Sequence, residues 1–197
     1  MPGSQDGAAC RVAACVLLAW ILVAPSASTA PPSEKPSLLQ PERAGPSPAP
    51  QAEQARDPHA IIETEHGKIT LSLFPEVAPK TVTRFSELVK KGFYNGLTFH
   101  RVVPKFLVQG GDPAGDGTGG SGQTITAEFN ERKHVAGTVG MARTRGSDSA
   151  DSQFYICLEP QPFLDGKYTV FGQVVEGMEV VGKIQANDVM LKVWLKP

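Results

Sequence analysis

The chain has 197 residues, of which 41% are hydrophobic and 20% charged, and its formal net charge is −1. This near-neutral balance excludes the basic surface expected of a protein that binds nucleic acid or an anionic membrane. The three cysteines are Cys10, Cys15 and Cys157, and no CxxC or HxxxH spacing occurs. We therefore expect no disulfide framework and no metal site. The length allows one domain plus accessory segments.

An uninterrupted apolar run of thirteen residues occupies positions 12–24, directly after Arg11. A membrane-spanning helix needs about 20 apolar residues, so this run has the length of a signal-peptide core. Small residues follow at 26–30, as a leader peptidase requires. We expect residues 1–30 to be a signal peptide, or an anchor that stays attached, and the protein to be exported to a periplasmic or other extracytoplasmic place. Membrane contact is expected only if this segment is not cleaved.

Prolines dominate the next segment, residues 31–57. Eight of the 17 prolines lie between Pro31 and Pro58, with Ser, Ala, Gln and Glu among them. Such a composition buries too little apolar surface to offset the entropy of ordering, and it favours extended conformers. The segment is predicted to be a disordered linker that acts as a spacer. The alternative is a docking segment for a proline-reading domain.

Short apolar alternations begin after Pro58 and predict a mostly β domain. Strands are expected at 60–65, 68–74, 98–103, 106–109, 138–142, 153–158, 169–175 and 189–195. One helix is expected to begin at Pro79 and to end before Gly92, and a second to span 178–185. In the last strand, residues 189, 191, 193 and 195 alternate toward the core. Helices too few for βαβ units and many Gly-rich turns favour an antiparallel barrel or sandwich.

Two further features of the sequence are only weak evidence for a functional site. Residues 115–120, GDGTGG, match the dinucleotide pattern G-x-G-x-x-G, but a strand-like stretch follows where that motif needs a helix. We expect a mobile surface loop and no nucleotide. The four histidines are scattered, and only His100 falls in an apolar strand. We expect His100 to satisfy local hydrogen bonds.

The segment from Phe99 to Asp112 is the most informative part of the chain. A period of two places Arg101 on the face of Phe99 and Val103, where an arginine is seldom buried without a partner. If Arg101 points inward or toward a rim, it lies beside Phe106 and Gln109. These residues then predict an apolar pocket that offers the guanidinium of Arg101 as a rigid hydrogen-bond donor and the side-chain amide of Gln109. The alternative is an arginine packed in an internal salt bridge.

Four blocks of the sequence, in chain order, are FHRVVPKFLVQGGDPAGDGTGG, GTVGMAR, SQFYICL and FLDGKYTVFGQV. They resemble the signature blocks of the cyclophilin-type peptidyl-prolyl cis-trans isomerases, and the glycine loop and GMAR block are more similar to bacterial members. The resemblance covers about His59 to the C-terminus. It implies that residues 58–197 form a closed eight-stranded antiparallel β-barrel capped by two α-helices. It also implies an enzyme that accelerates isomerisation of X-Pro bonds while exported proteins fold.

The resemblance assigns catalytic roles to Arg101, Phe106 and Gln109, with the arginine stabilising the twisted state of the X-Pro bond. The residues that it implies for substrate binding are Leu107, Gly117, Ala142, Arg143, Gln153, Tyr155, Phe163, Leu164 and Tyr168. Isomerisation by this route needs no cofactor and no metal. The partners implied are proline-containing peptides and unfolded or folding proteins, and we expect a monomer.

Five of these residues depart from the commonest eukaryotic pattern of the family. Leu107 replaces methionine, Tyr155 phenylalanine, Arg143 asparagine, Phe163 tryptophan and Tyr168 histidine. Because Phe163 lacks an indole N–H, we expect weak cyclosporin binding with activity retained. The Tyr155 hydroxyl enters an apolar pocket, where it must either find a partner or point to water.

Overall fold

A computed structural model describes residues 58–196 of the chain. The predicted signal peptide and linker, residues 1–57, lie outside the described residues. Within 58–196, no helix combines the length and the apolar character needed to cross a bilayer. The described part contains strands β1 (His59–Thr64), β2 (Gly67–Leu73), β3 (Arg101–Val103), β4 (Leu107–Gly110), β5 (Thr138–Met141), β6 (Phe154–Cys157), β7 (Val170–Glu176) and β8 (Lys192–Lys196). Helices α1 (Pro79–Lys90) and α2 (Met178–Val181) and the 3-10 helix η1 (Pro162–Leu164) complete it.

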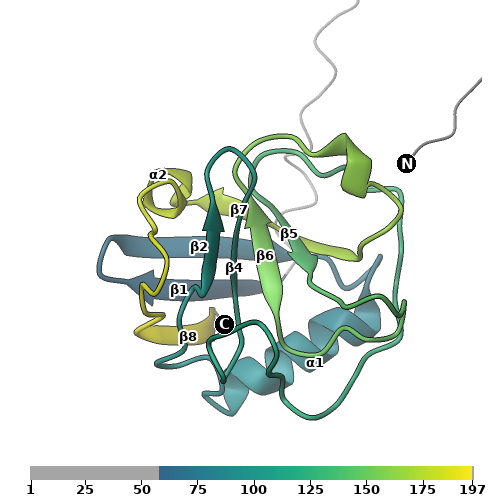
Figure 1. Cartoon of the computed structure of the whole chain (residues 1–197), viewed down its shortest axis with the longest axis horizontal. Helices are drawn as coiled ribbons and strands as arrows, with labels where there is room; N and C mark the ends of the chain where they lie inside the picture. Colours follow the sequence, from purple (N-terminus) through teal and green to yellow (C-terminus); the bar gives the residue numbers. More distant parts are fainter. Residues whose placement is uncertain (1–57, 197) are drawn as a thin grey trace, which may run out of the picture. The chain divides into compact units, whose positions relative to one another are not determined.

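The eight strands form one curled antiparallel sheet in the order β3-β4-β6-β5-β7-β2-β1-β8 (Figure 1). The mainly β class and the eight strands are thus confirmed, but the closed barrel is wrong, because β3 and β8 are not paired. A single bridge, Thr98 to Val189, connects the segments that precede these two strands. Backbone hydrogen bonds from Phe99 N–H to the Asp188 carbonyl and from Asn187 N–H to the Phe99 carbonyl support it. The result is a half-barrel with a seam.

Helix α1 begins at Pro79, where the missing N–H of proline costs no hydrogen bond. Its N-terminus is capped from a distance: the Glu128 carboxylate accepts hydrogen bonds from the N–H groups of Lys80 and Thr81 at 3.0 and 2.8 Å. A carboxylate there also complements the helix dipole. The helix ends before Gly92, whose φ of +68° suits glycine, as the sequence predicted. Figure 1 shows α1 and α2 at different ends of the curled sheet.

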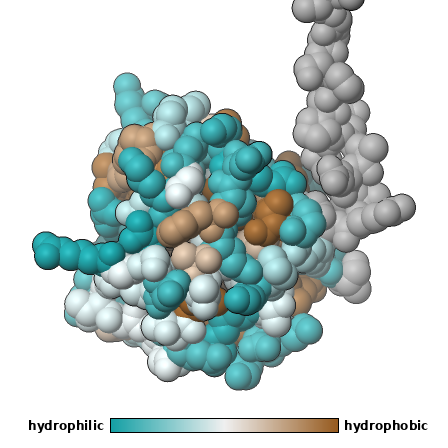
Figure 2. Space-filling view, turned by 90° about the vertical axis from the view of Figure 1, so that its right-hand side faces the viewer, coloured by the Kyte–Doolittle hydropathy of each residue, from teal (hydrophilic) through white to brown (hydrophobic). Residues whose placement is uncertain are grey.

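The core lies between the sheet and α1. The helix buries one apolar face, and the ring of Phe85 lies 5.2 to 5.7 Å from the rings of Tyr94, Phe154 and Phe171. Tyr94 carries the only hydroxyl of this aromatic cluster, which donates to the Ser152 carbonyl at 3.0 Å. The face of the molecule drawn in Figure 2 carries small apolar patches separated by hydrophilic side chains.

The end of the chain departs from the predicted pattern. Strand β8 begins at Lys192, and α2 stops at Val181. Met190 is buried, whereas Leu191 is 55% exposed, so the expected inward alternation of 189, 191, 193 and 195 is wrong before β8. The reason lies in long-range contacts: the Met190 N–H donates to the Leu97 carbonyl across the seam, and the Leu191 N–H donates to the Glu63 backbone carbonyl.

Candidate active site

An apolar pocket of about 220 Å³ opens on the outer face of the sheet beside β3, β4 and β6. Leu107 and Tyr155 form its buried floor together with Leu164 from η1, and Cys157 packs behind them. We call this the apolar pocket. Nine of the twelve residues predicted for the site line it: Arg101, Phe106, Leu107, Gln109, Ala142, Arg143, Tyr155, Leu164 and Tyr168.

Arg101 stands at the rim of the apolar pocket and is exposed. Its guanidinium carbon lies 5.9 Å from the centre of the Phe106 ring, and Nη1 donates to Gln109 Oε1 at 3.3 Å. Within residues 58–196 it pairs with no carboxylate, so the internal salt bridge is excluded. The shared face with Phe99 is also wrong, because β3 starts only at Arg101 and Phe99 lies before it, fully buried in the core.

A chain of side-chain amides holds Gln109 in place. Gln109 Nε2 donates to Gln153 Oε1 at 2.9 Å, and Gln153 Nε2 donates to the carbonyls of Gly117 and Gly119 at 3.0 and 2.8 Å. These residues belong to a second depression of about 450 Å³, the polar groove, which shares Gln109, Ala142 and Arg143 with the apolar pocket. The predicted neighbours Gly117 and Gln153 lie in this groove.

The loop that borders the polar groove is built on one buried carboxylate. Asp112 accepts hydrogen bonds from the backbone N–H groups of Ala114, Asp116 and Gly117. No helix follows the glycine run, as the strand-like sequence after it predicted; Ile125 forms an isolated bridge with Ala150. The loop is instead anchored to Asp112 and presents the Gly117 carbonyl to Gln153.

The Tyr155 hydroxyl found a partner within the protein. Its oxygen lies 2.9 Å from His134 Nε2, and His134 Nδ1 lies 3.0 Å from Asp165 Oδ1. An ionised carboxylate only accepts, so Nδ1 donates to Asp165, and in the neutral form of the ring Nε2 accepts the hydroxyl hydrogen. Hydrogen bonds from the backbone and the ring of His134 lower the pKa of Asp165, and burial raises the pKa of Tyr155. The three groups therefore form a fixed Asp–His–Tyr network under the apolar pocket.

Arg143 and Tyr168 close another side of the apolar pocket. The Arg143 guanidinium donates to the Lys167 carbonyl through Nε and Nη2 at 3.1 and 3.0 Å and lies 4.7 Å from the Tyr168 ring centre. Phe163 is the one predicted residue that lines neither depression. It is 57% exposed, and its ring lies 5.7 Å from that of Phe106, so it supports the pocket wall from outside.

Sequence reasoning missed three side chains and misread a fourth. His134, Asp165 and Asp112 carry the networks just described, and the demand of the Tyr155 hydroxyl for a partner was the one signal that pointed to such a network. His100 was expected to satisfy local hydrogen bonds, but neither ring nitrogen has a hydrogen-bond partner within the described residues. Burial lowers the pKa of His100, which favours a neutral ring.

The fold and the site define a mainly β protein with an apolar pocket beside an arginine. Comparison with known proteins specifies the class. Residues 59–196 match the family model described as cyclophilin type peptidyl-prolyl cis-trans isomerase/CLD. A peptidyl-prolyl cis-trans isomerase of Synechococcus elongatus is 51% identical over 136 residues, which are 68% of this chain and 93% of that one. Peptidyl-prolyl cis-trans isomerase B of Bacillus subtilis is 51% identical over 128 residues, 64% of this chain and 89% of that one.

A solved structure agrees with these relatives. A Cryptosporidium parvum cyclophilin type peptidyl-prolyl cis-trans isomerase, crystallised in the presence of the dipeptide Ala-Pro, superposes with a TM-score of 0.66 at 27% identity. The match covers 71% of this chain and 99% of that one. The chain belongs to the cyclophilin-type peptidyl-prolyl cis-trans isomerase family. It is accordingly an enzyme that isomerises X-Pro peptide bonds.

Proposed function

We propose that the proline ring of the substrate enters the apolar pocket and that Arg101 stabilises the twisted X-Pro bond. Amide resonance gives this bond a rotation barrier of about 18–20 kcal/mol. In the twisted state the prolyl nitrogen regains its lone pair, and a hydrogen bond donated to it favours that state over both planar ones. The single observation that carries the proposal is the position of the Arg101 guanidinium at the rim, next to the Phe106 ring.

The other residues hold the substrate on either side of that bond. Phe106, Leu107, Tyr155 and Leu164 provide apolar surface for the ring. Gln109, oriented by Gln153, offers an amide to the peptide backbone. The residues before proline would run along the polar groove, past Ala142 and Arg143, which both depressions share. Arginine remains protonated at any working pH, so this mechanism needs no proton transfer.

We further propose that the clients are exported proteins in a periplasmic or other extracytoplasmic place. The support is in the sequence: the apolar run at 12–24, the small residues after it and the Pro-rich stretch that separates it from the domain. Proteins that fold outside the cytoplasm contain X-Pro bonds whose isomerisation takes tens to hundreds of seconds without a catalyst. N-terminal sequencing of the native protein tests export, and an intact Met1 would contradict cleavage.

The mechanism is tested with a coupled prolyl-peptide assay on the full-length chain. Arg101→Ala should lower kcat/KM about 100-fold, or about 2.7 kcal/mol of transition-state stabilisation. Arg132→Ala is the matched control, because that arginine lines neither depression. An unchanged rate for Arg101→Ala would refute the role of the arginine while leaving the family assignment intact. A wild-type rate no faster than the uncatalysed reaction would instead indicate a module that only binds proline peptides.

A further inference from the structure

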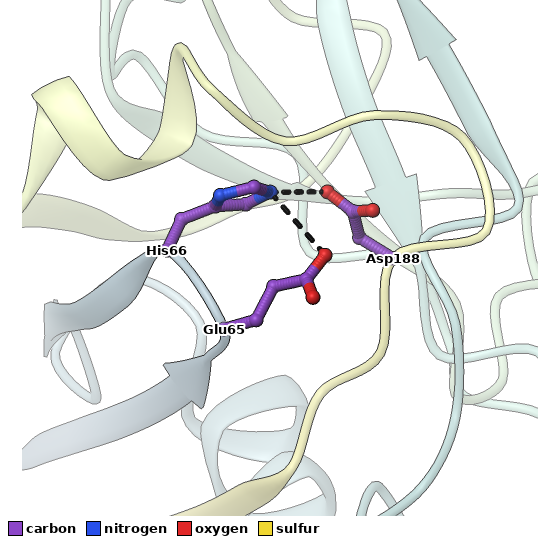
Figure 3. A group of neighbouring side chains, drawn as sticks. All are labelled: Glu65, His66 and Asp188. Carbon is purple, nitrogen blue, oxygen red and sulfur yellow. Dashed lines mark hydrogen bonds and ion pairs between the residues drawn. The ribbon is translucent and has the colours of Figure 1, made fainter.

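A histidine and two carboxylates from distant parts of the sequence meet beside the turn between β1 and β2 (Figure 3). His66 Nε2 lies 2.8 Å from Asp188 Oδ2 and 3.6 Å from Glu65 Oε1. Glu65 and His66 form the turn, and Asp188 lies in the segment before β8. We propose that these three side chains form a binding site for a divalent metal ion, with Zn²⁺ as the best fit. None of them lines the apolar pocket or the polar groove, so the site is separate from catalysis.

The donor set and its spacing fit the ion. One imidazole nitrogen and two carboxylate oxygens are ligands that Zn²⁺ takes in proteins, with a water completing the tetrahedron. Ligand bonds of about 2.0–2.2 Å at tetrahedral angles separate neighbouring donor atoms by about 3.3 Å. All three candidate atoms lie within 4.8 Å of one another, and the two distances from Nε2 fall on either side of that spacing. The Glu65 side chain is 65% exposed, which leaves it free to adjust and leaves room for the water.

The charge of the cluster also calls for a cation. Across residues 58–196, Glu65 and Asp188 form ion pairs with His66 alone and with no lysine or arginine. The donor atoms of the two carboxylates lie within 4.8 Å of each other, and the Asp188 side chain is only 14% exposed, so solvent screens its charge poorly. A divalent ion would neutralise both carboxylates and accept the lone pair of His66 Nε2.

Two of the three ligands are held in place by hydrogen bonds with neighbouring residues. The His66 N–H donates to Thr64 Oγ1 at 3.1 Å, and the same hydroxyl donates to the Gly67 carbonyl at 3.1 Å, which fixes the turn. Asp188 Oδ2 accepts the Gln185 N–H at 2.7 Å. Such outer hydrogen bonds orient ligating side chains and increase metal affinity. Binding would therefore order little beyond Glu65.

The position of the site indicates what the ion would do. Asp188 belongs to the segment that hydrogen-bonds Phe99 across the seam between β3 and β8. A metal ion would tie this segment to the β1–β2 turn, next to the seam where β3 and β8 are not paired. Because the unfolded chain does not bring residues 66 and 188 together, binding would stabilise the folded state. The ion would thus act as a structural clamp.

The test is calorimetric titration of ZnCl₂ into the metal-free full-length protein, with thermal unfolding followed in parallel. The wild type should bind one more equivalent of Zn²⁺ than His66→Gln or Asp188→Asn, and Zn²⁺ should raise Tm of the wild type but not of either variant. His59→Gln, at the other end of β1, is the control and should behave as wild type. Glu65→Gln should weaken binding at least 10-fold while leaving the isomerase rate unchanged.

Two results would overturn the proposal. If His66→Gln and Glu65→Gln bind Zn²⁺ with the stoichiometry and affinity of the wild type, the ion is held elsewhere, for example by the N-terminal cysteines. If the wild type binds no Zn²⁺, the cluster is an ion pair only. Should His66→Gln or Asp188→Asn fail to fold, Glu65→Gln decides the question, because its exposed side chain can be changed without loss of packing.

Discussion

The hydroxyl oxygen of Tyr155 lies 2.9 Å from His134 Nε2, so the floor of the apolar pocket is joined to a buried imidazole. A neighbouring strand supports the same ring: Gly140 pairs with Tyr155 in the ladder, and a Cβ atom at position 140 would collide with the phenol. The ring therefore has one orientation, set by a hydrogen bond at its tip and by bare backbone beneath it.

Replacing Tyr155 by phenylalanine should remove the hydrogen bond to His134 and keep the packing of the ring against Gly140. The ring keeps its volume, but His134 Nε2 loses its partner while it stays buried, which costs about 1–3 kcal/mol of unfolding free energy. We expect kcat/KM to remain within a few-fold of wild type, because the substrate meets the ring and not the hydroxyl. Denaturant unfolding and the peptide assay measure the two effects. A variant as stable as the wild type would show that the hydrogen bond contributes nothing.

Asp165 should make the stability of the domain sensitive to acid. Hydrogen bonds from His134 lower its folded-state pKa below the unfolded value of about 3.9. Between the two pKa values the unfolded chain binds more protons, so this contribution is present above about pH 4 and is lost as the pH falls through the folded pKa. Asp165→Asn should therefore lose more stability at pH 7 than at pH 3 in denaturant titrations. Equal losses at both pH values would argue against the ionised network.

Asp112 should matter to substrate binding without touching substrate. Its buried carboxylate holds the N–H groups of the loop that presents the Gly117 carbonyl to Gln153. In Asp112→Asn an amide NH₂ faces those donors, so we expect a loss of about 1–3 kcal/mol in stability and an increase of KM larger than the decrease of kcat. Asp116→Asn, at an exposed position in the same loop, is the control. A fall in kcat alone would contradict this role.

Cys157 should be inert in the native enzyme. Its side chain is fully buried behind Leu107 and Tyr155, and burial raises the pKa of the thiol to about 12. Since thiolates are the reactive species, a thiol reagent at pH 8 should not label Cys157 in a Cys10→Ser/Cys15→Ser background until denaturant is added. Labelling of the folded protein at the rate of a free thiol would mean that the pocket floor opens readily.

Local sequence patterns were enough to predict much of the fold. The β1 and β2 alternations and the start and end of α1 follow from side-chain periodicity, from Pro79 and from Gly92, all of which act within a few residues. The predicted strands are wrong where hydrogen bonds from distant segments of the chain determine the backbone. Residues 97–99 and 187–190 lie across the seam from each other, and this contact shifts the burial of Met190 and Leu191 in a way that no local period encodes.

The sequence by itself determined the family, through four blocks of residues, and with it the set that lines the apolar pocket and the polar groove. Eleven of the twelve predicted site residues lie there, and Phe163 packs against Phe106 from outside. Only the tertiary structure decided the exposure of Arg101, the partner of Tyr155 and the meeting of Glu65, His66 and Asp188. Each of these depends on atoms from segments that are tens of residues apart in the sequence. The curl of the sheet brings such segments together.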